Sequence, residues 1–535
     1  MQRAWSGEVG WRFALTVVAA LAAYVLVMVA LAARSRGIWL DEIWSLWLSQ
    51  GDVPLEQVAT QRWFQDVHPP IFSAINWAFD PLVGDGMFGR RMINLIWVFY
   101  FFAGAGFLAA KYPSTRKFIL VFVVLILANR HMALYFPEHR SYTMVLGLSA
   151  TVICCLQWLF SADRDFDLRK DLGAALLTVF SVVLALNVHF VTTLILGLML
   201  GLALVALVLN KRYRAAGLVF VAGALAGPPL LGALYAQSLY LTDATQTFWV
   251  ETGPLGAARK MVNVGAITIV ANLVALAVAL IVAAPLLLKG GLGERLRALR
   301  SAEPSQRSWR FVAVMVAAVL VPSLLLMAIS IVRPIVVERY LLSFVAIIMA
   351  GIAALAAEQI LARKWLFVLF AVNAVLAFTL FVQKPLHDLR WNETAVKVKR
   401  IVDSCPGTRV YALYPTYVKP YPAAANQPPV HWWGYQHVAE EAGFRVTSLD
   451  PERSGPIALS PTCPTVLWAE HMEQRRHAAE VLDDEPFAAH APQLQAALRA
   501  AKVDFGAPKA TGFVLVIPPT PAAPPQPQSP APAAP

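Results

Sequence analysis

Eleven long apolar runs constrain this chain more than any other feature of its sequence. A run of about 18 apolar residues can cross roughly 30 Å of hydrocarbon as a helix. Hydrophobic residues make up 58% of the 535 positions and charged residues only 14%, which is too apolar for one soluble domain. We predict a polytopic α-helical membrane protein with about eleven transmembrane helices. Their expected bounds are 12–33, 92–110, 118–136, 141–160, 172–188, 190–209, 215–236, 263–288, 311–331, 341–360 and 365–382.

The first apolar run, from Phe13 to Ala33, has an alternative interpretation as a cleaved signal peptide. Its end, Ala30-Leu31-Ala32-Ala33, resembles a signal-peptidase site. The run is longer than the roughly 7–15 residues of a typical signal core. We therefore predict that it is retained as a transmembrane helix.

Every second loop between the apolar runs is basic. Because lysine and arginine concentrate in cytoplasmic loops, we expect these loops and the N-terminus inside. An odd number of spans then places the loop 34–91 and everything after residue 383 outside. The net charge of +11 follows mostly from this topology and gives little reason to expect a nucleic-acid partner. The basic residues are Lys111, Arg116, Lys117, Arg164, Arg169, Lys170, Lys211, Arg212, Arg214, Arg295, Arg297, Arg300, Arg307, Arg310, Arg363 and Lys364.

Beyond residue 383 the composition becomes that of a globular protein. Short strand patterns alternate with helical patterns, which is typical of a small α/β domain. We expect a transmembrane domain over 1–383, an external α/β domain over 384–518 and a disordered tail, rich in Pro and Ala, over 519–535. The expected strands are 409–414, 444–449, 465–469 and 512–517, and the expected helices are 393–402, 435–442 and 492–501.

The four cysteines fall into two pairs. Cys154 and Cys155 lie within a predicted span, where they are expected to be packing residues. Cys405 and Cys463 lie in the external domain, where an oxidising exterior would allow a disulfide. Whether they form one is left open by the sequence.

The polar motifs gather in the loops that we place outside. Asp41-Glu42 and His68-Pro69-Pro70 lie in the first loop, 34–91, joined by amphipathic segments that can lie in the membrane interface. Arg90-Arg91 precedes the second span. Further motifs enter other spans at the same predicted face: Glu138-His139-Arg140-Ser141-Tyr142, Asn187-Val188-His189-Phe190 and Glu338-Arg339-Tyr340. Charged groups at membrane entrances are costly unless they are used, so we expect a reaction centre here.

These motifs, in this order, resemble glycosyltransferase family 39, the bacterial relatives of protein O-mannosyltransferases and of the aminoarabinose transferases that modify lipid A. The matching forms are W-x-D-E, D-x-H-P-P, E-x-R-x-Y, H-[FY] and E-R-Y-L-L, spread over residues 11–360. The resemblance implies the GT-C membrane fold and a polyprenyl-phosphate sugar as donor. It also implies that Asp41 is the catalytic aspartate, and that the protein sits in the bacterial inner membrane with its active site facing the periplasm.

Transfer of a sugar from a lipid phosphate needs a base near the acceptor hydroxyl and cations at the leaving phosphate. Asp41, beside the second carboxylate Glu42, is our candidate base. The guanidinium fork of arginine matches phosphate oxygens, and Arg140 and Arg339 are the leading candidates for that task. His68 is expected to orient or protonate near the phosphate. We also predict substrate contacts from Arg90, Arg91, Glu138, Tyr142, His189, Glu338 and Tyr340.

Each candidate also has a structural interpretation. Asp41 and Glu42 are also suited to cap an interfacial helix. Arg90 and Arg91 are long enough to snorkel to lipid headgroups. Arg140 with Glu138, and Arg339 with Glu338, have the spacing of structural ion pairs. His189 at a helix turn suits an ordinary loop histidine. The aromatic clusters of the external domain suit either a sugar-stacking surface or a core; they comprise His431, Trp432, Trp433, Tyr411, Tyr414, Tyr417 and Tyr421.

Two other functional classes stay open. A lipid-linked sugar transporter or flippase would show broken spans and an ionisable residue near the midplane. A non-catalytic scaffold would not need polar clusters at several span entrances. The expected partners are the lipid donor, membrane lipids and an envelope glycan, lipid or protein acceptor. Carboxylates and a phosphate suit Mg²⁺ or Mn²⁺, but no dedicated metal motif is present, so we predict no metal site and leave divalent-cation dependence open.

Overall fold

The structure is a computed structural model. It describes residues 8–66, 68–84, 86–162, 164–240, 253–288, 304–388, 390–413, 430–449, 459–469, 502–504 and 513–519. Contacts divide the chain into two compact units. The first combines Met1–Ser35 with Leu48–His387, and the second combines Arg36–Trp47 with Asp388–Pro535. Each unit is described by itself.

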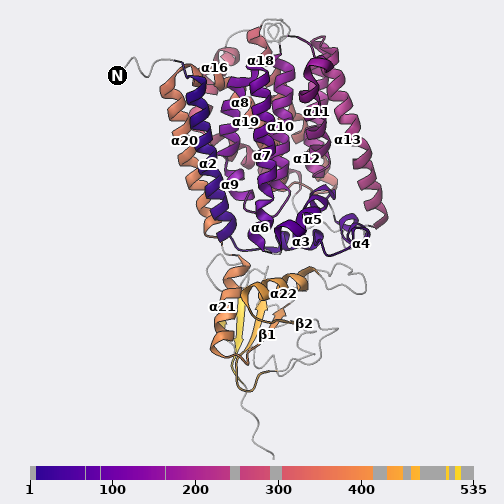
Figure 1. Cartoon of the computed structure of the whole chain (residues 1–535), viewed down its shortest axis with the longest axis vertical. Helices are drawn as coiled ribbons and strands as arrows, with labels where there is room; N and C mark the ends of the chain where they lie inside the picture. The colour runs from indigo at the N-terminus through magenta and orange to yellow at the C-terminus, as the bar shows by residue number, and fades with distance from the viewer. Residues whose placement is uncertain are drawn as a thin grey trace, which may run out of the picture. The chain divides into compact units, whose positions relative to one another are not determined.

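The first unit is a bundle of long antiparallel helices (Figure 1). Its short helices are α4 (Leu55–Gln61), η1 (Trp63–Gln65), α5 (Ile71–Val83), α6 (Met87–Met92), η2 (Pro113–Thr115), α9 (Arg130–Tyr135) and η3 (Glu338–Tyr340). Its longer helices are α2 (Trp11–Ser35), α7 (Asn94–Lys111), α8 (Arg116–Leu127), α10 (Tyr142–Ser161), α11 (Leu168–Leu186), α12 (Phe190–Leu209), α13 (Tyr213–Tyr240), α15 (Pro254–Val270), α16 (Leu273–Leu288), α18 (Pro304–Val332), α19 (Leu342–Ala362) and α20 (Lys364–Leu386).

Within the described residues, eight helices are long and apolar enough to cross a membrane, and a ninth results if α15 and α16 form one span bent by 98°. The other predicted runs differ for local reasons. Run 118–136 is split into α8 and α9 at Asn129, whose side chain accepts the N–H of His131 at 2.8 Å and so begins a new helix. Run 172–188 corresponds to α11, which begins with charged residues. The polytopic helical fold is confirmed.

The bundle core is built around α10. Every residue of α10 except Ser161 is buried, and α7 and α19 pack against it. A Cβ atom at Gly147 would lie 2.8 Å from the carbonyl oxygen of Trp97, so glycine lets α7 and α10 approach closely. The outer helices expose large apolar side chains instead; Leu225 on α13, Leu320 on α18 and Leu380 on α20 are examples. Such a surface suits lipid rather than water, and the chain is an integral membrane protein.

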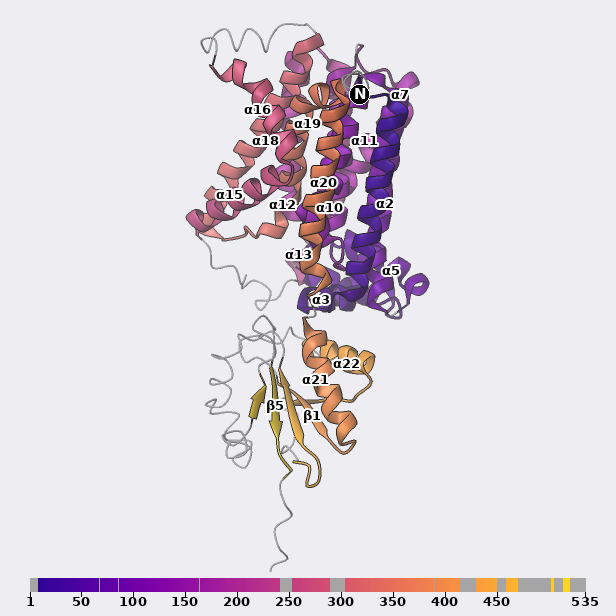
Figure 2. The same cartoon turned by 90° about the vertical axis from the view of Figure 1, so that its left-hand side faces the viewer.

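The alternation of helix direction sorts the connections between the two ends of the bundle (Figure 2). The connections with residues 66–70, 136–142, 187–190 and 333–341 lie at one end. The other end, which we call the basic end, carries Lys111 and Arg116 at helix ends, and Arg164, Lys211 and Arg363 in its connections. The predicted separation of site motifs from basic loops is therefore present in the fold.

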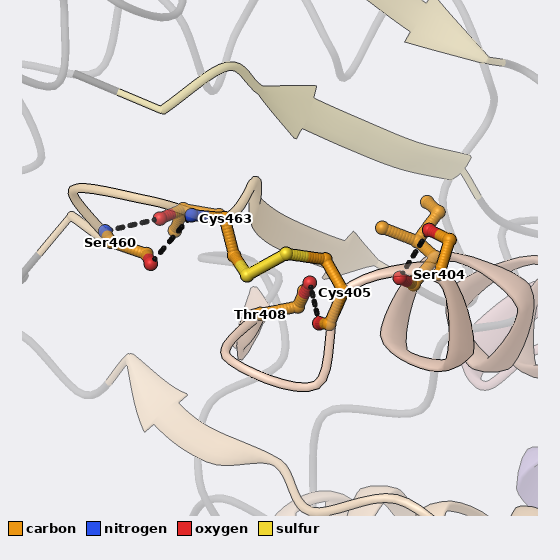
Figure 3. Close-up of a disulfide and its surroundings, with 7 residues drawn as sticks. Ser404, Cys405, Thr408, Ser460 and Cys463 are labelled. Atoms are coloured by element: carbon orange, nitrogen blue, oxygen red, sulfur yellow. Dashed lines mark hydrogen bonds between the residues drawn. A yellow bond between two sulfur atoms is a disulfide. The ribbon is translucent and has the colours of Figure 1, made fainter. Parts of the chain in front are cut away.

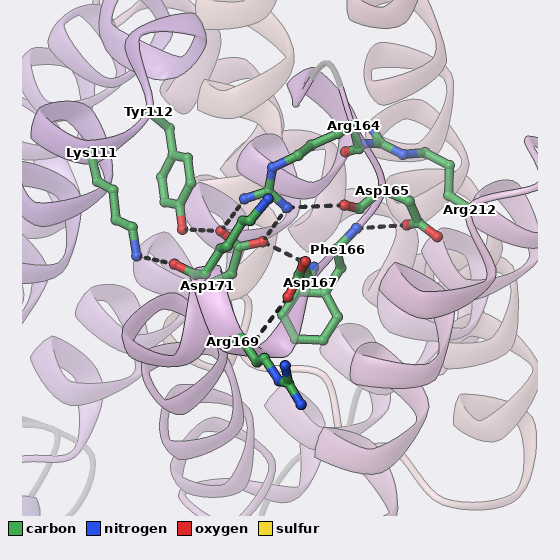
Figure 4. Close-up of polar contacts among 10 residues, drawn as sticks. Lys111, Tyr112, Arg164, Asp165, Phe166, Asp167, Arg169, Asp171 and Arg212 are labelled. Atoms are coloured by element: carbon green, nitrogen blue, oxygen red, sulfur yellow. Dashed lines mark hydrogen bonds and ion pairs between the residues drawn. The ribbon is translucent and has the colours of Figure 1, made fainter.

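A buried carboxylate organises part of the basic end (Figure 4). Asp171, at the start of α11, is 2% exposed. It accepts hydrogen bonds from Arg164 at 2.9 and 2.8 Å, from the Tyr112 hydroxyl at 2.9 Å and from the Asp167 N–H at 3.1 Å. Burial alone would raise the pKa of Asp171, but these donors and the charge of Arg164 outweigh it and hold that pKa below its ordinary value.

The second unit contains the predicted α/β domain. Its helices are α3 (Leu40–Leu48, up to residue 47), α21 (Trp391–Ser404) and α22 (Val430–Ala442). Its strands are β1 (Arg409–Leu413), β2 (Thr447–Leu449), β3 (Thr465–Ala469), β4 (Lys502–Asp504) and β5 (Phe513–Ile517). The sheet order is β2-β1-β3-β5-β4, in which β1 pairs in parallel with β2 and β3, and β5 pairs antiparallel with β3 and β4. The predicted helix 492–501 and most of the tail 519–535 lie outside the described residues.

The core of the second unit is aromatic. The Trp468 ring on β3 contacts the rings of Tyr435 and Phe444, at centroid distances of 5.0 and 5.5 Å. Its indole N–H donates to Thr394 on α21 at 2.9 Å. Cys405 and Cys463 form a disulfide that joins the end of α21 to the segment before β3 (Figure 3). Three of the seven predicted sugar-stacking residues, Tyr414, Tyr417 and Tyr421, lie outside the described residues, and a sugar-stacking role for the others stays a prediction.

Candidate active site

Three rings from distant parts of the sequence meet at one end of the helical unit. His68 precedes α5, His189 precedes α12 and Tyr340 ends η3. The ring centroids of His68 and His189 are 4.6 Å apart, those of His189 and Tyr340 are 4.3 Å apart, and those of His68 and Tyr340 are 5.6 Å apart. We call these three residues the ring cluster.

His189 is oriented by the helix that it caps. Its Nδ1 accepts the N–H of Val191 at 3.2 Å, in place of the usual Asn or Ser at the N-cap of α12. Acceptance at Nδ1 assigns the proton of the neutral ring to Nε2. His189 is 3% exposed, and its Nε2 has no hydrogen-bond partner among the described residues. A buried N–H donor of this kind is available to an anionic ligand.

A glutamine on α13 fixes the loop that carries His68. The Nε2 of Gln237 donates to the carbonyl oxygens of Asp66 at 2.8 Å and of His68 at 2.9 Å. Pro70 follows as the N-cap of α5, so the loop is stiff on its other side too. Gln237, which lies outside the His68-Pro69-Pro70 motif, thus restricts the same loop that the two prolines are predicted to stiffen.

Two arginines supply the positive charge of the site. Arg140 precedes α10 and Arg339 lies in η3 beside Tyr340. Burial, first, and then the positive charges of Arg140 and Arg339 lower the pKa of His189 to about 3. Burial, the neighbouring His189 and the same two arginines hold the pKa of His68 well below its ordinary value. Both histidines are therefore neutral near pH 7, and the charge near the ring cluster comes from the arginines.

The arginines are held by the segments around them. The Arg140 guanidinium carbon lies 5.7 Å from the centre of the Tyr142 ring, and that of Arg339 lies 5.8 Å from the Tyr340 ring. Tyr142 is 1% exposed, and its ring also packs 5.0 Å from that of Tyr135. These rings restrict the arginines, which favours a fixed charge over a mobile surface one.

Two asparagines that the sequence analysis did not identify contact Glu138 and Glu338, the glutamates near the two arginines in sequence. The side chain of Asn94 donates to the carbonyl oxygens of Phe136 at 2.8 Å and Glu138 at 2.7 Å. The side chain of Asn263 on α15 donates to the carboxylate of Glu338 at 2.6 Å. For Asn94, which is buried, an amide at the start of an apolar helix was the available signal, because burying one is costly without a partner.

Arg90 and Arg91 are engaged in the protein interior. They are 3% and 1% exposed, so neither snorkels to a lipid headgroup. Arg90 pairs with Asp80 and donates to the carbonyl oxygen of Gly84 at 2.9 Å. Arg91 donates to the carbonyl oxygen of Ala33 at 2.8 Å. These contacts hold the first loop, and substrate binding by the two arginines stays a prediction.

Asp41 and Glu42 belong to the second unit. Both lie in the first turn of α3, where the helix dipole favours acidic residues. Glu42 is fully buried, and Asp41 is partly exposed. A carboxylate in this position suits the start of a helix, and a catalytic role for Asp41 stays a prediction. Within the described residues, no group of three or more His, Cys, Asp or Glu side chains could hold a metal.

No family model matches the chain, and no curated protein matches it significantly in sequence. Solved structures do. ArnT from Cupriavidus metallidurans bound to undecaprenyl phosphate aligns with a TM-score of 0.50 at 12% identity, and the apo state of ArnT aligns with a TM-score of 0.50 at 11% identity. Both matches cover 93% of this chain and 97% of the other chain.

The chain has the GT-C fold. Because the alignment runs over nearly the whole of both chains, it includes the α/β domain as well as the helical bundle. This confirms the fold that the motif order implied. Undecaprenyl phosphate is the ligand of the ArnT structure.

Proposed function

We propose that the protein is a membrane glycosyltransferase that uses a polyprenyl-phosphate sugar donor. The observation that carries the proposal is the ring cluster with its two arginines. A buried Nε2–H of His189 and two guanidinium groups form a preorganised set of donors for a phosphate. The GT-C fold and the undecaprenyl phosphate bound by ArnT support the same class of ligand.

In the proposed reaction, Asp41 accepts the proton of an acceptor hydroxyl. The acceptor oxygen forms a bond to the anomeric carbon of the sugar, and the bond from that carbon to the phosphate oxygen breaks. The polyprenyl phosphate leaves with the electron pair. Arg140 and Arg339 neutralise its charge, and His189 donates a hydrogen bond to it. His68 packs on the His189 ring and holds it in place. Support for Asp41 comes from its motif and its place in the first turn of α3.

We infer that the site faces the periplasm across the bacterial inner membrane. The ring cluster and the basic end lie at opposite ends of the bundle. The positive-inside rule favours a cytoplasmic location for the basic end. Envelope glycans, lipids or proteins are then the available acceptors.

The first test is phosphate binding. Purified protein in nanodiscs should bind undecaprenyl phosphate, and Arg140→Ala and Arg339→Ala should each weaken binding at least tenfold. Lysine keeps the charge but loses the fork, so Arg→Lys should lie between. Arg363→Ala, an exposed arginine at the basic end, is the control and should bind as wild type does. Equal affinity in all variants would refute the phosphate assignment.

The second test is turnover. A panel of undecaprenyl-phosphate pentoses and hexoses is incubated with the protein and an envelope extract, and released undecaprenyl phosphate is measured. We call this the transfer assay. Release that depends on both a sugar and the extract would support transfer. Binding of undecaprenyl phosphate with no release from any member of the panel would count against an enzyme.

One observation favours the transporter alternative. The 98° bend between α15 and α16 marks a broken span or a re-entrant loop, and discontinuous spans are a feature of many transporters. Against it, the charged residues of the site lie at the end of the bundle rather than at mid-depth. Movement of a fluorescent undecaprenyl-phosphate sugar across proteoliposome membranes would separate the two, because the glycosyltransferase should leave its distribution unchanged.

A further inference from the structure

The segment that carries Asp41 and Glu42 is bonded to the start of the external domain. The N–H of Gly37 donates to the carbonyl oxygen of Asp388 at 2.9 Å, and the N–H of Trp391 donates back to the carbonyl oxygen of Ile38 at 3.2 Å. The N–H of Ile38 also donates to the side chain of Asn392 at 3.2 Å. Two backbone stretches, 36–39 and 388–392, are thus tied together just before α3 begins.

Charged side chains reinforce this junction. Asp388 accepts from Arg390 at 2.8 Å and pairs with Arg36 at 3.5 Å. The Arg390 guanidinium carbon lies 4.3 Å from the centre of the Trp39 ring, a close cation–π contact. Arg390 has a φ of +46°, which disfavours any residue but glycine. A strained arginine held over Trp39 indicates that the surrounding contacts determine its position.

Trp39 links this junction to the carboxylates. Its carbonyl oxygen accepts the N–H groups of Glu42 and Ile43, both at 3.0 Å, and so starts α3. Asp41 lies two residues after Trp39, within the turn that these bonds close. A shift of Trp39 therefore shifts the first turn of α3 and the carboxylates on it.

The other side of this turn packs on α22. A Cβ atom at Gly434 would lie only 2.6 Å from the Cγ2 atom of Ile43, and Ile43 is fully buried beside Glu42. Next to Gly434, the Tyr435 ring lies 5.3 Å from the Trp391 ring and 5.0 Å from the Trp468 ring of the sheet. Helix α3 thus rests on the core of the external domain, and only glycine allows this approach.

We propose that the external domain positions the catalytic carboxylates, and that Arg390 and Gly434 are its positioning residues. The contacts lie on both sides of Asp41, at Gly37 to Trp39 and at Ile43, so the domain sets where the carboxylates stand. The inference rests on the proposed role of Asp41. It makes the external domain part of the catalytic apparatus, although Arg390 and Gly434 touch no reacting atom.

Two substitutions test the proposal in the full-length protein. Gly434→Ala adds one methyl group against Ile43, and Arg390→Gly relieves the backbone while removing the cation–π contact. Each should lower release in the transfer assay at least tenfold, since small misplacement of a catalytic group is costly. Undecaprenyl phosphate binding should stay within twofold. Hydrogen exchange of the amides in 40–48 should rise while that of α10 is unchanged.

Matched controls separate positioning from stability. Gly217→Ala on α13 makes the same change where a Cβ atom meets nothing within 4 Å, and it should behave as wild type. Ile43→Ala should restore part of the activity lost in Gly434→Ala, because the clash is removed. If Gly434→Ala fails to fold, Arg390→Gly decides alone, since it adds no bulk.

The outcomes are distinguishable from failure of the proposed function. Normal release by folded Gly434→Ala and Arg390→Gly, while Asp41→Asn is inactive, would overturn the positioning role only. Unchanged exchange in 40–48 would also overturn it. Normal release by Asp41→Asn would instead remove the proposed base.

Discussion

At the scale of single residues, the sequence indicates the charged and ionisable residues of the candidate site, but not the neutral residues that hold its loops. Arg140, Arg339 and His189 were predicted because charged or ionisable residues at span entrances need a reason to be there. Gln237 and Asn94 were not, because an amide carries no charge and its partners are distant in sequence. Their hydrogen bonds to loop carbonyls become visible only when the helices are assembled.

Asp41, the proposed general base, is the first residue to test. Asp41→Asn keeps the size of the side chain but removes the proton acceptor. Release in the transfer assay should fall by roughly two to four orders of magnitude, the usual cost of losing a general base. Undecaprenyl phosphate binding should persist, since the phosphate is assigned to other residues. Near-normal release would exclude Asp41 as the base.

His189 predicts a dependence of stability on pH. Its pKa is lowered to about 3 in the folded protein, by burial and then by Arg140 and Arg339, while an unfolded histidine has a pKa of about 6.5. Below about pH 6.5 the unfolded state therefore binds more protons, and stability falls as the pH drops towards 3. Each such histidine contributes at most about 1.4 kcal/mol of unfolding free energy per pH unit.

The matched variant is His189→Asn. Asparagine can still cap α12 by accepting the Val191 N–H, but it does not titrate. The thermal midpoint of the wild-type protein in detergent should fall more steeply between pH 7 and 4.5 than that of the variant. Parallel pH profiles would contradict a buried neutral His189.

At the scale of elements, the apolar runs located the helices but not their breaks. Run 263–288 is bent between α15 and α16, where Asn272 accepts the N–H of Ala275 at 3.0 Å and starts the second helix. Asn129 does the same between α8 and α9. Both breaks have an asparagine N-cap inside an apolar run. Hydropathy averages over such a residue, whereas capping chemistry identifies it.

The start of α11 gives a prediction at this scale. Arg164→Ala leaves the buried carboxylate of Asp171 with the Tyr112 hydroxyl and the Asp167 N–H. Because the Arg164 side chain is 47% exposed, solvent screens part of the loss, and we expect a destabilisation of about 1–2 kcal/mol. Arg169→Ala, an exposed arginine on the same turn, should cost less than about 0.5 kcal/mol. Thermal unfolding in detergent measures both, and equal effects would contradict the network.

At the scale of the whole molecule, composition already indicated an integral membrane protein, whereas the orientation expected from charge stays a prediction. Within the described residues, the chain runs the length of the bundle eleven times if α8–α9 and α15–α16 each count as one passage. Eleven spans are predicted from the sequence, whereas eight of the described helices, or nine with α15–α16 as one span, are long and apolar enough to cross a membrane. The grouping of residues 36–47 with the external domain was beyond sequence reasoning, because the residues that join them lie some 350 positions apart.

The number of passages also predicts on which side of the membrane each end of the chain lies. An odd number of passages places the two ends of the helical unit's chain on opposite sides, and the basic end is expected in the cytoplasm. A reporter that fluoresces only in the cytoplasm should therefore be dark when fused after Pro535. The same reporter inserted after Lys211, at the basic end, should be bright and serves as the control. A bright signal at Pro535 would mean that one passage is not a span, and it would place the external domain with the cytoplasm rather than the envelope.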